Sequence, residues 1–225
     1  MRVLAIDTAL ANCAAAVLDD NPGAVRLTER GEEIGRGHAE MLMSIISEVM
    51  AESSTAFNEL DRIVVTTGPG SFTGLRVGLS VARGFGLVLQ KPVVGVTTLA
   101  AIALAHSGPD HDGPLLVALD GKGDEVYCQR FSVEGQPIDD AGVQTIGELA
   151  RTLPDGIRLA GSAAERIAVA CGFDMDCVRS SCGYPAIGDV ARLGVITDPK
   201  SAAPVPLYLR APDATPGKSG RIMRQ

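Results

Sequence analysis

The most regular pattern in the chain lies at residues 61–90, where a short apolar run precedes a long apolar segment rich in glycine. The run at residues 63–65 indicates a buried strand that ends at a Gly-Pro-Gly turn. Because residues four apart share one helix face, the segment that follows predicts a helix with a seam of small residues. Such a seam suits close approach by another helix or strand. The seam consists of Gly70, Gly74, Gly78, Ala82 and Gly86.

The remaining faces of this helix are also largely apolar. Arg76, Arg83 and Gln90 form a thin polar line at seven-residue spacing. A helix that is apolar nearly all round is typical of a protein interior, so we expect a buried central helix. Ser71 stands at its start and is expected to cap it.

Strand and helix patterns alternate on both sides of this segment. Ahead of it, the sequence predicts strands at 2–7, 13–18 and 25–29, a loop at 31–37 and a helix at 38–52. After it come a strand at 93–96 and a helix at 98–106. Turn-forming residues at 107–114 then divide the chain, and a similar pattern begins again. Its expected strands are 115–119, 125–132, 142–146 and 157–160, and its expected helices are 147–153, 163–170 and 187–196.

The order of these elements indicates a duplicated α/β unit, βββαβαβα, whose halves each open with a strand ending on an acid. This arrangement resembles the actin/Hsp70/sugar-kinase (ASKHA) superfold with a reduced second domain. We expect an N-terminal subdomain at 1–107, a smaller C-terminal subdomain at 108–214 and a basic, disordered tail at 215–225. In that superfold, the paired strand-end acids hold a magnesium nucleotide. Fold resemblance alone does not establish that activity here.

Asp7 and Asp120 are the two strand-end acids and are the candidates for a metal-phosphate site. Gly68 and Gly70 are candidates for a phosphate loop, but Thr73 occupies the third glycine position of the dinucleotide fingerprint. The lysine of a P-loop is also missing from the glycine segment. Asp7 could equally close its own turn. A small phosphotransferase that uses Asp7 and Asp120 therefore stays open as the alternative function.

Composition and charge exclude several classes of function. The 225 residues carry a net charge of −7, which argues against a strong grip on nucleic acid by this chain alone. The five cysteines include no C-x-x-C pair, and the three histidines lack the spacing of a zinc protease, so we expect no metal site. No nucleophile elbow is present. We expect a cytoplasmic protein with reduced thiols, no membrane segment and no cofactor.

The helix that begins at His38 carries a stripe sufficient for packing on a sheet: Leu42, Ile45, Ile46 and Val49. Methionines at 41, 43 and 50 widen the apolar arc to about 200°, more than a surface helix of one domain needs. Methionine adapts to partner surfaces. We therefore expect a partner surface on this helix, with a deeper core as the alternative.

Several motifs together resemble the TsaB family, also called YeaZ. The resemblance covers most of the chain, and the glycine-rich segment is its most specific part. It rests on residues 6–8, His38, the stretch 68–78, the stretch 94–101, the stretch 120–127 (DGKGDEVY) and the stretch 206–210 (PLYLR).

The resemblance implies a non-catalytic partner of the paralogue TsaD, which transfers a threonylcarbamoyl group onto the adenosine beside the anticodon of tRNA. TsaD carries a metal-binding His-x-x-x-His motif where this chain has residues 97–102 without a ligand, which also argues against a peptidase. Implied partners are TsaD, a second copy of the chain, an ATPase of the same complex, and tRNA only through that complex. The expected interface comprises His38, Met41, Leu42, Met43, Ile46, Met50, Gly70, Gly74, Arg76, Gly78 and Arg83.

Overall fold

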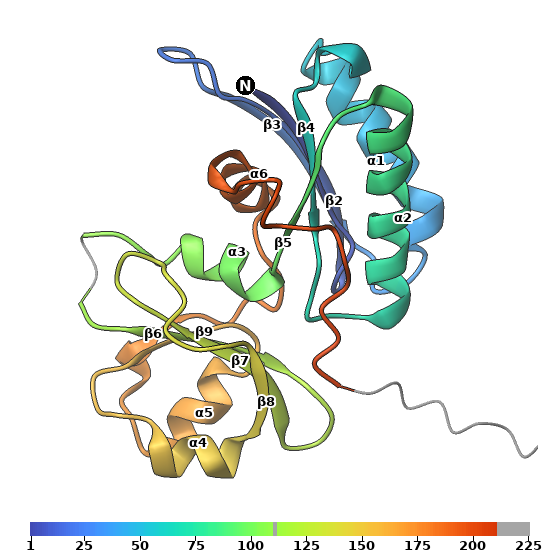
Figure 1. Cartoon of the computed structure of the whole chain (residues 1–225). Helices are drawn as coiled ribbons and strands as arrows, with labels where there is room; N and C mark the ends of the chain where they lie inside the picture. The colour runs from blue at the N-terminus through green and yellow to red at the C-terminus, as the bar shows by residue number, and fades with distance from the viewer. Residues whose placement is uncertain (110–111, 211–225) are drawn as a thin grey trace, which may run out of the picture.

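The computed structural model describes residues 1–109 and 112–210, which form two halves with one five-stranded sheet each (Figure 1). In the first sheet the strand order is β3-β2-β1-β4-β5. The strands β1, β2 and β3 are antiparallel neighbours, whereas β4 and β5 run parallel to β1. Their bounds are β1 Arg2–Asp7, β2 Asn12–Asp19, β3 Arg26–Glu33, β4 Arg62–Thr66 and β5 Val93–Val96.

The second sheet repeats this topology. Its order, β10-β9-β6-β7-β8, is the order of the first sheet read from the opposite edge, with the same parallel and antiparallel pairs. The repeat confirms the predicted duplication and the actin-like α/β class. The bounds are β6 Leu115–Asp120, β7 Glu125–Phe131, β8 Gly142–Thr145, β9 Arg158–Ala160 and β10 Val178–Ser180.

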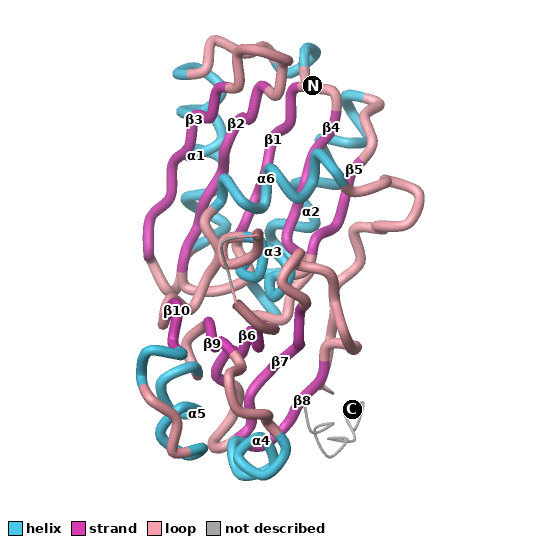
Figure 2. Tube along the Cα trace, turned by 90° about the vertical axis from the view of Figure 1, so that its left-hand side faces the viewer, coloured by secondary structure: helices cyan, strands magenta, loops and turns pink. Residues whose placement is uncertain are grey.

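Helices cover both faces of each sheet (Figures 1 and 2). On the first sheet, α1 and α2 pack against one face and α6 against the other. On the second sheet, α3 packs against the face turned toward the first half, and α4 and α5 against the opposite face. Their bounds are α1 His38–Glu52, α2 Phe72–Leu89, α3 Thr98–Leu104, α4 Ile146–Thr152, α5 Ala164–Cys171 and α6 Ile187–Ile196, with short 3₁₀ turns at Phe57–Glu59 and Met175–Cys177.

Strand β1 lies at the centre of the first sheet and is buried on both faces from Val3 onward. Leu4 and Ile6 contact the layer of α1 and α2, and Val3 and Ala5 contact α6. Since successive strand residues point to opposite faces, burial on both faces explains why this strand is a continuous apolar run.

The last described part of the chain returns to the first half. Helix α6 packs on the first sheet, and the segment after it continues there: Gly95 N donates to Ala202 O (2.9 Å) and Leu207 N to Thr67 O (2.7 Å). The side chain of Arg62 donates to the carbonyls of Gly194 (2.7 Å) and Thr197 (2.9 Å). Residues 187–207 therefore pack on the first sheet, although their sequence position places them in the expected subdomain 108–214.

Two expectations about elements were wrong. Strand β3 runs on to Glu33 through Gly31, where a loop was expected, because it pairs with β2 along its whole length. Helix α2 is not buried all round: Leu87 is 81% exposed and Val88 is 79% exposed. Its outer face has no covering layer among the described residues. The expected disordered tail, 215–225, lies outside those residues.

Helix α2 is also the one helix of the described ranges that is long and apolar enough to cross a membrane. This is weak evidence, because the core helix of a soluble protein meets the same criterion. One face of α2 packs on β1 and β4, and its six buried residues are Gly74, Leu75, Gly78, Leu79, Ala82 and Gly86.

The glycine seam of α2 faces the chain's own backbone. A Cβ at Gly74 would meet the carbonyl oxygen of Thr8, and one at Gly70 would meet that of Ala9. Thr8 Oγ1 donates to Gly74 O at 2.7 Å, a bond that fixes the β1–β2 turn on the helix. The expected close approach is confirmed: the turn after β1 approaches the seam at Gly70 and Gly74, and Val93 of β5 approaches it at Gly86.

Candidate functional site

The first strand-end acid, Asp7, is fully buried under the β1–β2 turn. Its Oδ1 accepts hydrogen bonds from Thr66 Oγ1 (2.6 Å) and from the amide of Ala9 (2.9 Å). Its Oδ2 is buried without a hydrogen-bond partner among the described residues. Burial raises the pKa of Asp7 above its ordinary value, although the two hydrogen bonds act in the opposite direction. This carboxyl closes the turn from inside the first half.

The second strand-end acid, Asp120, lies in a different setting at the end of β6. Its Oδ1 forms an ion pair with Arg166 Nη1 at 2.6 Å, and its amide donates to Ser162 Oγ at 2.9 Å. Asp120 lines a cavity between the halves, whereas Asp7 does not. The two carboxylates therefore differ in setting, because Asp7 is enclosed in the first half and Asp120 faces the cavity with Arg166 as its partner. In the described ranges, His, Cys, Asp and Glu side chains form no group of three that could hold a metal ion.

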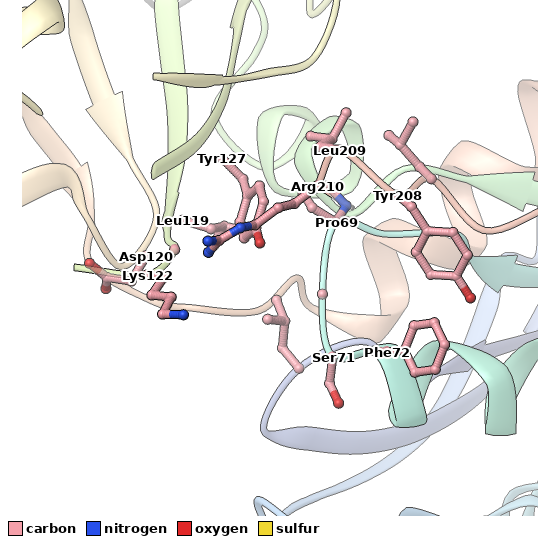
Figure 3. Close-up of a pocket in the computed structure, with 14 residues that line it drawn as sticks. Pro69, Ser71, Phe72, Leu119, Asp120, Lys122, Tyr127, Tyr208, Leu209 and Arg210 are labelled. Carbon is pink, nitrogen blue, oxygen red and sulfur yellow. The ribbon is translucent and has the colours of Figure 1, made fainter. Parts of the chain in front are cut away.

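The cavity between the halves has a volume of about 720 Å³ and is open to solvent. Its walls come from the start of α2, from the β6–β7 turn and from the segment that follows α6 (Figure 3). Aromatic and aliphatic side chains share these walls with cations. The lining residues are Leu10, Pro69, Gly70, Ser71, Phe72, Leu119, Asp120, Gly121, Lys122, Tyr127, Leu207, Tyr208, Leu209 and Arg210.

The two candidate phosphate-loop glycines lie where the first half meets this cavity. Gly68 adopts a positive φ of 107°, and a Cβ there would lie 3.2 Å from the carbonyl of Leu207. Gly70 lines the cavity and packs on Ala9. Ser71 caps α2, as expected, by accepting from Gly74 N at 3.3 Å. Both glycines thus serve a tight turn and close packing.

Sequence reasoning missed Phe72, Lys122, Tyr127 and Tyr208 as site residues. Their stretches were noted only as family motifs, because nothing in one local pattern shows that three distant segments meet. One signal could have found them. The family motifs contain aromatic and basic residues that do not follow the hydrophobic pattern of a core, which indicates a role at a surface or site.

On α1, the expected interface residues fall into two groups. Leu42, Ile46 and Met50 are buried in the core of the first half. His38 is buried too, and its Nε2 donates to the carbonyl of Leu10 at 2.9 Å. Met41 is half-buried and Met43 is exposed. Of these six positions, Met43 offers the most surface to a partner.

On α2, Gly74 and Gly78 face the β1–β2 turn, as described above. Both arginines are exposed and bind the segment after α6: Arg83 Nε donates to Pro204 O (3.0 Å) and Arg76 Nε to Tyr208 Oη (3.4 Å). The outer face of α2 also presents Leu87 and Val88, which the sequence analysis did not assign to a surface.

Comparison with known proteins decides the family. The sequence model of the TsaD family, described as tRNA N6-adenosine threonylcarbamoyltransferase, matches residues 31–195. The tRNA threonylcarbamoyladenosine biosynthesis protein TsaB of Escherichia coli is 32% identical over 131 residues, which are 58% of this chain and 55% of that protein. The chain belongs to the TsaB/YeaZ branch of the TsaD family.

Other relatives of this TsaB-family chain extend the likeness to more than nine-tenths of its length. An uncharacterised protein of Mycobacterium tuberculosis is 37% identical over 217 residues, which are 95% of this chain and 94% of that protein. The structure of YeaZ from Pseudomonas aeruginosa superposes with a TM-score of 0.74 at 23% identity, over 92% of this chain and 99% of that one. At that identity the superposition establishes the shared fold.

Proposed function

We propose that this TsaB-family chain is a non-catalytic subunit of a tRNA-modifying assembly and that it binds a catalytic paralogue of the TsaD type. The E. coli relative is named for tRNA threonylcarbamoyladenosine biosynthesis, and the matching family model is named for the transferase. In this assembly the paralogue transfers the threonylcarbamoyl group to the adenosine next to the anticodon, and tRNA and an ATPase partner join only through the complex. We place the assembly in the cytoplasm.

The observation that carries the proposal is the uncovered outer face of α1 and α2, which we call the α1/α2 face. Its exposed members are Met43 on α1 and Ser80, Gly84, Leu87 and Val88 on α2. The small residues Ser80 and Gly84 are one turn apart, and a Cβ at Gly84 would meet nothing within 4 Å. Such a surface lets the backbone of a second helix approach closely, and it leaves large apolar side chains in water until a partner covers them.

The strand-end acids support the non-catalytic part of the proposal. Asp7 is closed off inside the first half, and Asp120 is held by Arg166. A metal-phosphate site of this fold needs both carboxylates at one place, and the described residues offer none of its other ligands as a cluster.

The test measures assembly by sedimentation velocity, with the full chain alone and with TsaD from the same organism. Burying one aliphatic side chain is worth roughly 1.5–3 kcal/mol, so a charge in its place weakens association by about tenfold or more. Met43→Glu and Leu87→Asp are therefore expected to weaken both self-association and TsaD binding, because both partners use the α1/α2 face and compete for it.

Val169→Glu is the matched control, since Val169 is exposed on α5 in the other half. This variant is expected to assemble like the parent. If both α1/α2 variants fold by circular dichroism and still bind TsaD with parental affinity, the interface lies elsewhere and the proposal fails.

A further inference from the structure

Two long stretches of this acidic chain contain no acidic residue. The sequence has 27 Asp and Glu, yet none lies between Asp61 and Asp110 or between Asp198 and Asp213. The first stretch contains α2, and the second contains the segment 202–210. The structure joins them, because this segment crosses α2 and accepts the hydrogen bonds of Arg76 and Arg83 described above. In a protein with a net charge of −7, α2 and this segment thus contribute cations and no carboxylate side chain to the surface they share, and the carboxylates nearby are Asp120 in the adjoining cavity and Glu125, which pairs with Arg210.

A stack of two rings and a guanidinium stands at one end of this face. The rings of Phe72 and Tyr208 lie 5.3 Å apart, and the guanidinium carbon of Arg76 lies 3.8 Å from the centre of the Phe72 ring. Both rings remain more than 40% exposed. Aromatic rings and guanidinium planes held in this way offer flat surfaces on which a further planar group can stack.

The stack opens onto the 720 Å³ cavity between the halves. Phe72 at the start of α2 and Tyr208 and Arg210 on the segment after α6 line it from one side, and Lys122 of the β6–β7 turn lines it from the other (Figure 3). Arg210 extends across the cavity, and its Nη1 lies 3.3 Å from Glu125 Oε2. We call these four lining residues and Arg76 the cleft rim. The cavity volume falls within the range of small-ligand sites, which is large enough for one unstacked nucleotide.

We infer that the cleft rim binds unpaired RNA nucleotides of the tRNA. Sequence-tolerant RNA contacts combine cations along the phosphates with aromatic side chains under the bases, and the cleft rim has both. If the occupant were an acidic protein instead of RNA, it would contact only the cations of the cleft rim, and the exposed rings would have no role. This inference rests on the proposed function, because a subunit of a tRNA-modifying assembly has tRNA as the polyanion within its reach.

The cleft rim and the α1/α2 face adjoin on α2, where Arg76 and Ser80 are one turn apart, but the aromatic stack of the rim and the large apolar residues of the face lie toward opposite ends of the helix. Fifteen residues separate Phe72 from Leu87, a distance of about 22 Å along the helix. A partner centred on Leu87 and Val88 therefore leaves the aromatic stack of the cleft rim accessible. The net charge of −7 keeps RNA affinity weak for the chain alone, so the contact contributes mainly within the assembly.

The absence of tryptophan from the sequence permits a direct probe. Tyr208→Trp places a single indole in the cleft rim, and its fluorescence is followed at low ionic strength during titration with single-stranded oligoadenylate. Saturable quenching is expected. A duplex RNA of the same length is expected to quench several-fold less, because its bases are not free to stack. Polyglutamate is expected to have no saturable effect.

Two further changes in the Tyr208→Trp chain test the mechanism. Phe72→Ala is expected to weaken oligoadenylate binding roughly fivefold or more through the lost stacking surface. Lys122→Ala is expected to reduce the dependence of affinity on salt by about one phosphate contact. Leu87→Asp is the matched control on the same helix, and it is expected to leave RNA binding unchanged while it weakens TsaD binding.

Three outcomes overturn the inference. Quenching by polyglutamate equal to that by RNA shows an acidic protein site or a general polyanion surface instead. Absence of saturable quenching by oligoadenylate, both alone and in the assembly with TsaD, shows that RNA does not use the cleft rim. Loss of TsaD binding in Phe72→Ala, with parental binding in both Met43→Glu and Leu87→Asp, assigns the cleft rim to the protein partner and separately refutes the proposed α1/α2 face.

Discussion

Asp7 shows how one residue type can serve two different purposes at the same place in a fold. An acid at the end of the first strand could bind a metal-phosphate group or close the turn that follows. In this chain Thr66 and the amide of Ala9 occupy one carboxyl oxygen, and the second oxygen is buried. The carboxyl thus holds the β1–β2 turn through one oxygen, and its burial has a cost that depends on pH.

The prediction at this position concerns Asp7→Asn. Because burial raises the pKa of Asp7 in the folded chain, the folded state binds more protons than the unfolded state above the ordinary pKa of 3.8. The stability that protonated Asp7 confers is thus fully present below its unfolded-state pKa of 3.8. It is lost as the pH rises from there through the higher pKa that Asp7 has in the folded chain. Asn keeps an acceptor for Thr66 and Ala9 and does not ionise. Between the unfolded-state and folded-state pKa values of Asp7, the variant is therefore expected to lose less stability than the parent.

Urea unfolding of the parent and of Asp7→Asn at a series of pH values from 3 upward measures the effect. The free energy of unfolding of the variant, relative to the parent, is expected to rise with pH and then level off. A difference that stays constant over the whole range would show that Asp7 titrates alike in the folded and unfolded chains.

At the scale of elements, helix α2 offers a matched pair of glycines. A Cβ at Gly74 would collide with the carbonyl of Thr8, whereas a Cβ at Gly84, on the outer face, would meet nothing within 4 Å. Gly84→Ala is expected to stabilise the chain by roughly 0.5–1 kcal/mol, because alanine favours the helix. Gly74→Ala is expected to destabilise it by about 1–3 kcal/mol, because the β1–β2 turn must move.

Chemical denaturation at one protein concentration tests both changes, so that self-association is held constant. Equal effects of the two substitutions would contradict the assigned roles of the two faces. Gly84→Ala also adds a methyl group to the α1/α2 face, and its effect on assembly is read separately by sedimentation.

The sequence predicted α1 and α6 with their observed bounds, because their apolar stripes have helical period and clear ends. It did not predict how far β3 extends, because that strand is mostly exposed and its polar residues resemble a loop. Nor did it predict the exposed face of α2. An apolar residue pattern shows that a surface avoids water, but it does not show whether the chain itself or a partner covers that surface.

At the scale of the whole molecule, the two halves are joined by more than the chain between them. Helix α6 leaves the second half to pack on the first sheet, and the segment beyond it crosses α2. These contacts join residues more than a hundred positions apart, such as Arg83 and Pro204. No local pattern in the sequence encodes such contacts, so the cavity they help to form was not predictable from motifs alone.

Arg158 fixes the chain between the halves to the second sheet. This side chain is buried, and its guanidinium donates to His106 O (2.6 Å) and twice to Gly113 O (3.1 and 3.0 Å). Both carbonyls belong to the connection between α3 and β6. Arg158→Met keeps much of the side-chain volume but removes the donors, and it leaves two carbonyls without these partners. A loss of about 2–4 kcal/mol in the free energy of unfolding is expected.

Because the lost hydrogen bonds hold the connection itself, the same variant is expected to be cleaved faster between the halves by a non-specific protease. Mass spectrometry of the first fragments locates the cut. Arg151→Met is the control, since Arg151 is exposed on α4 and its replacement is expected to change stability by less than about 0.5 kcal/mol. If Arg158→Met unfolds at the parental denaturant concentration and its first cuts fall elsewhere, Arg158 does not hold the connection between α3 and β6.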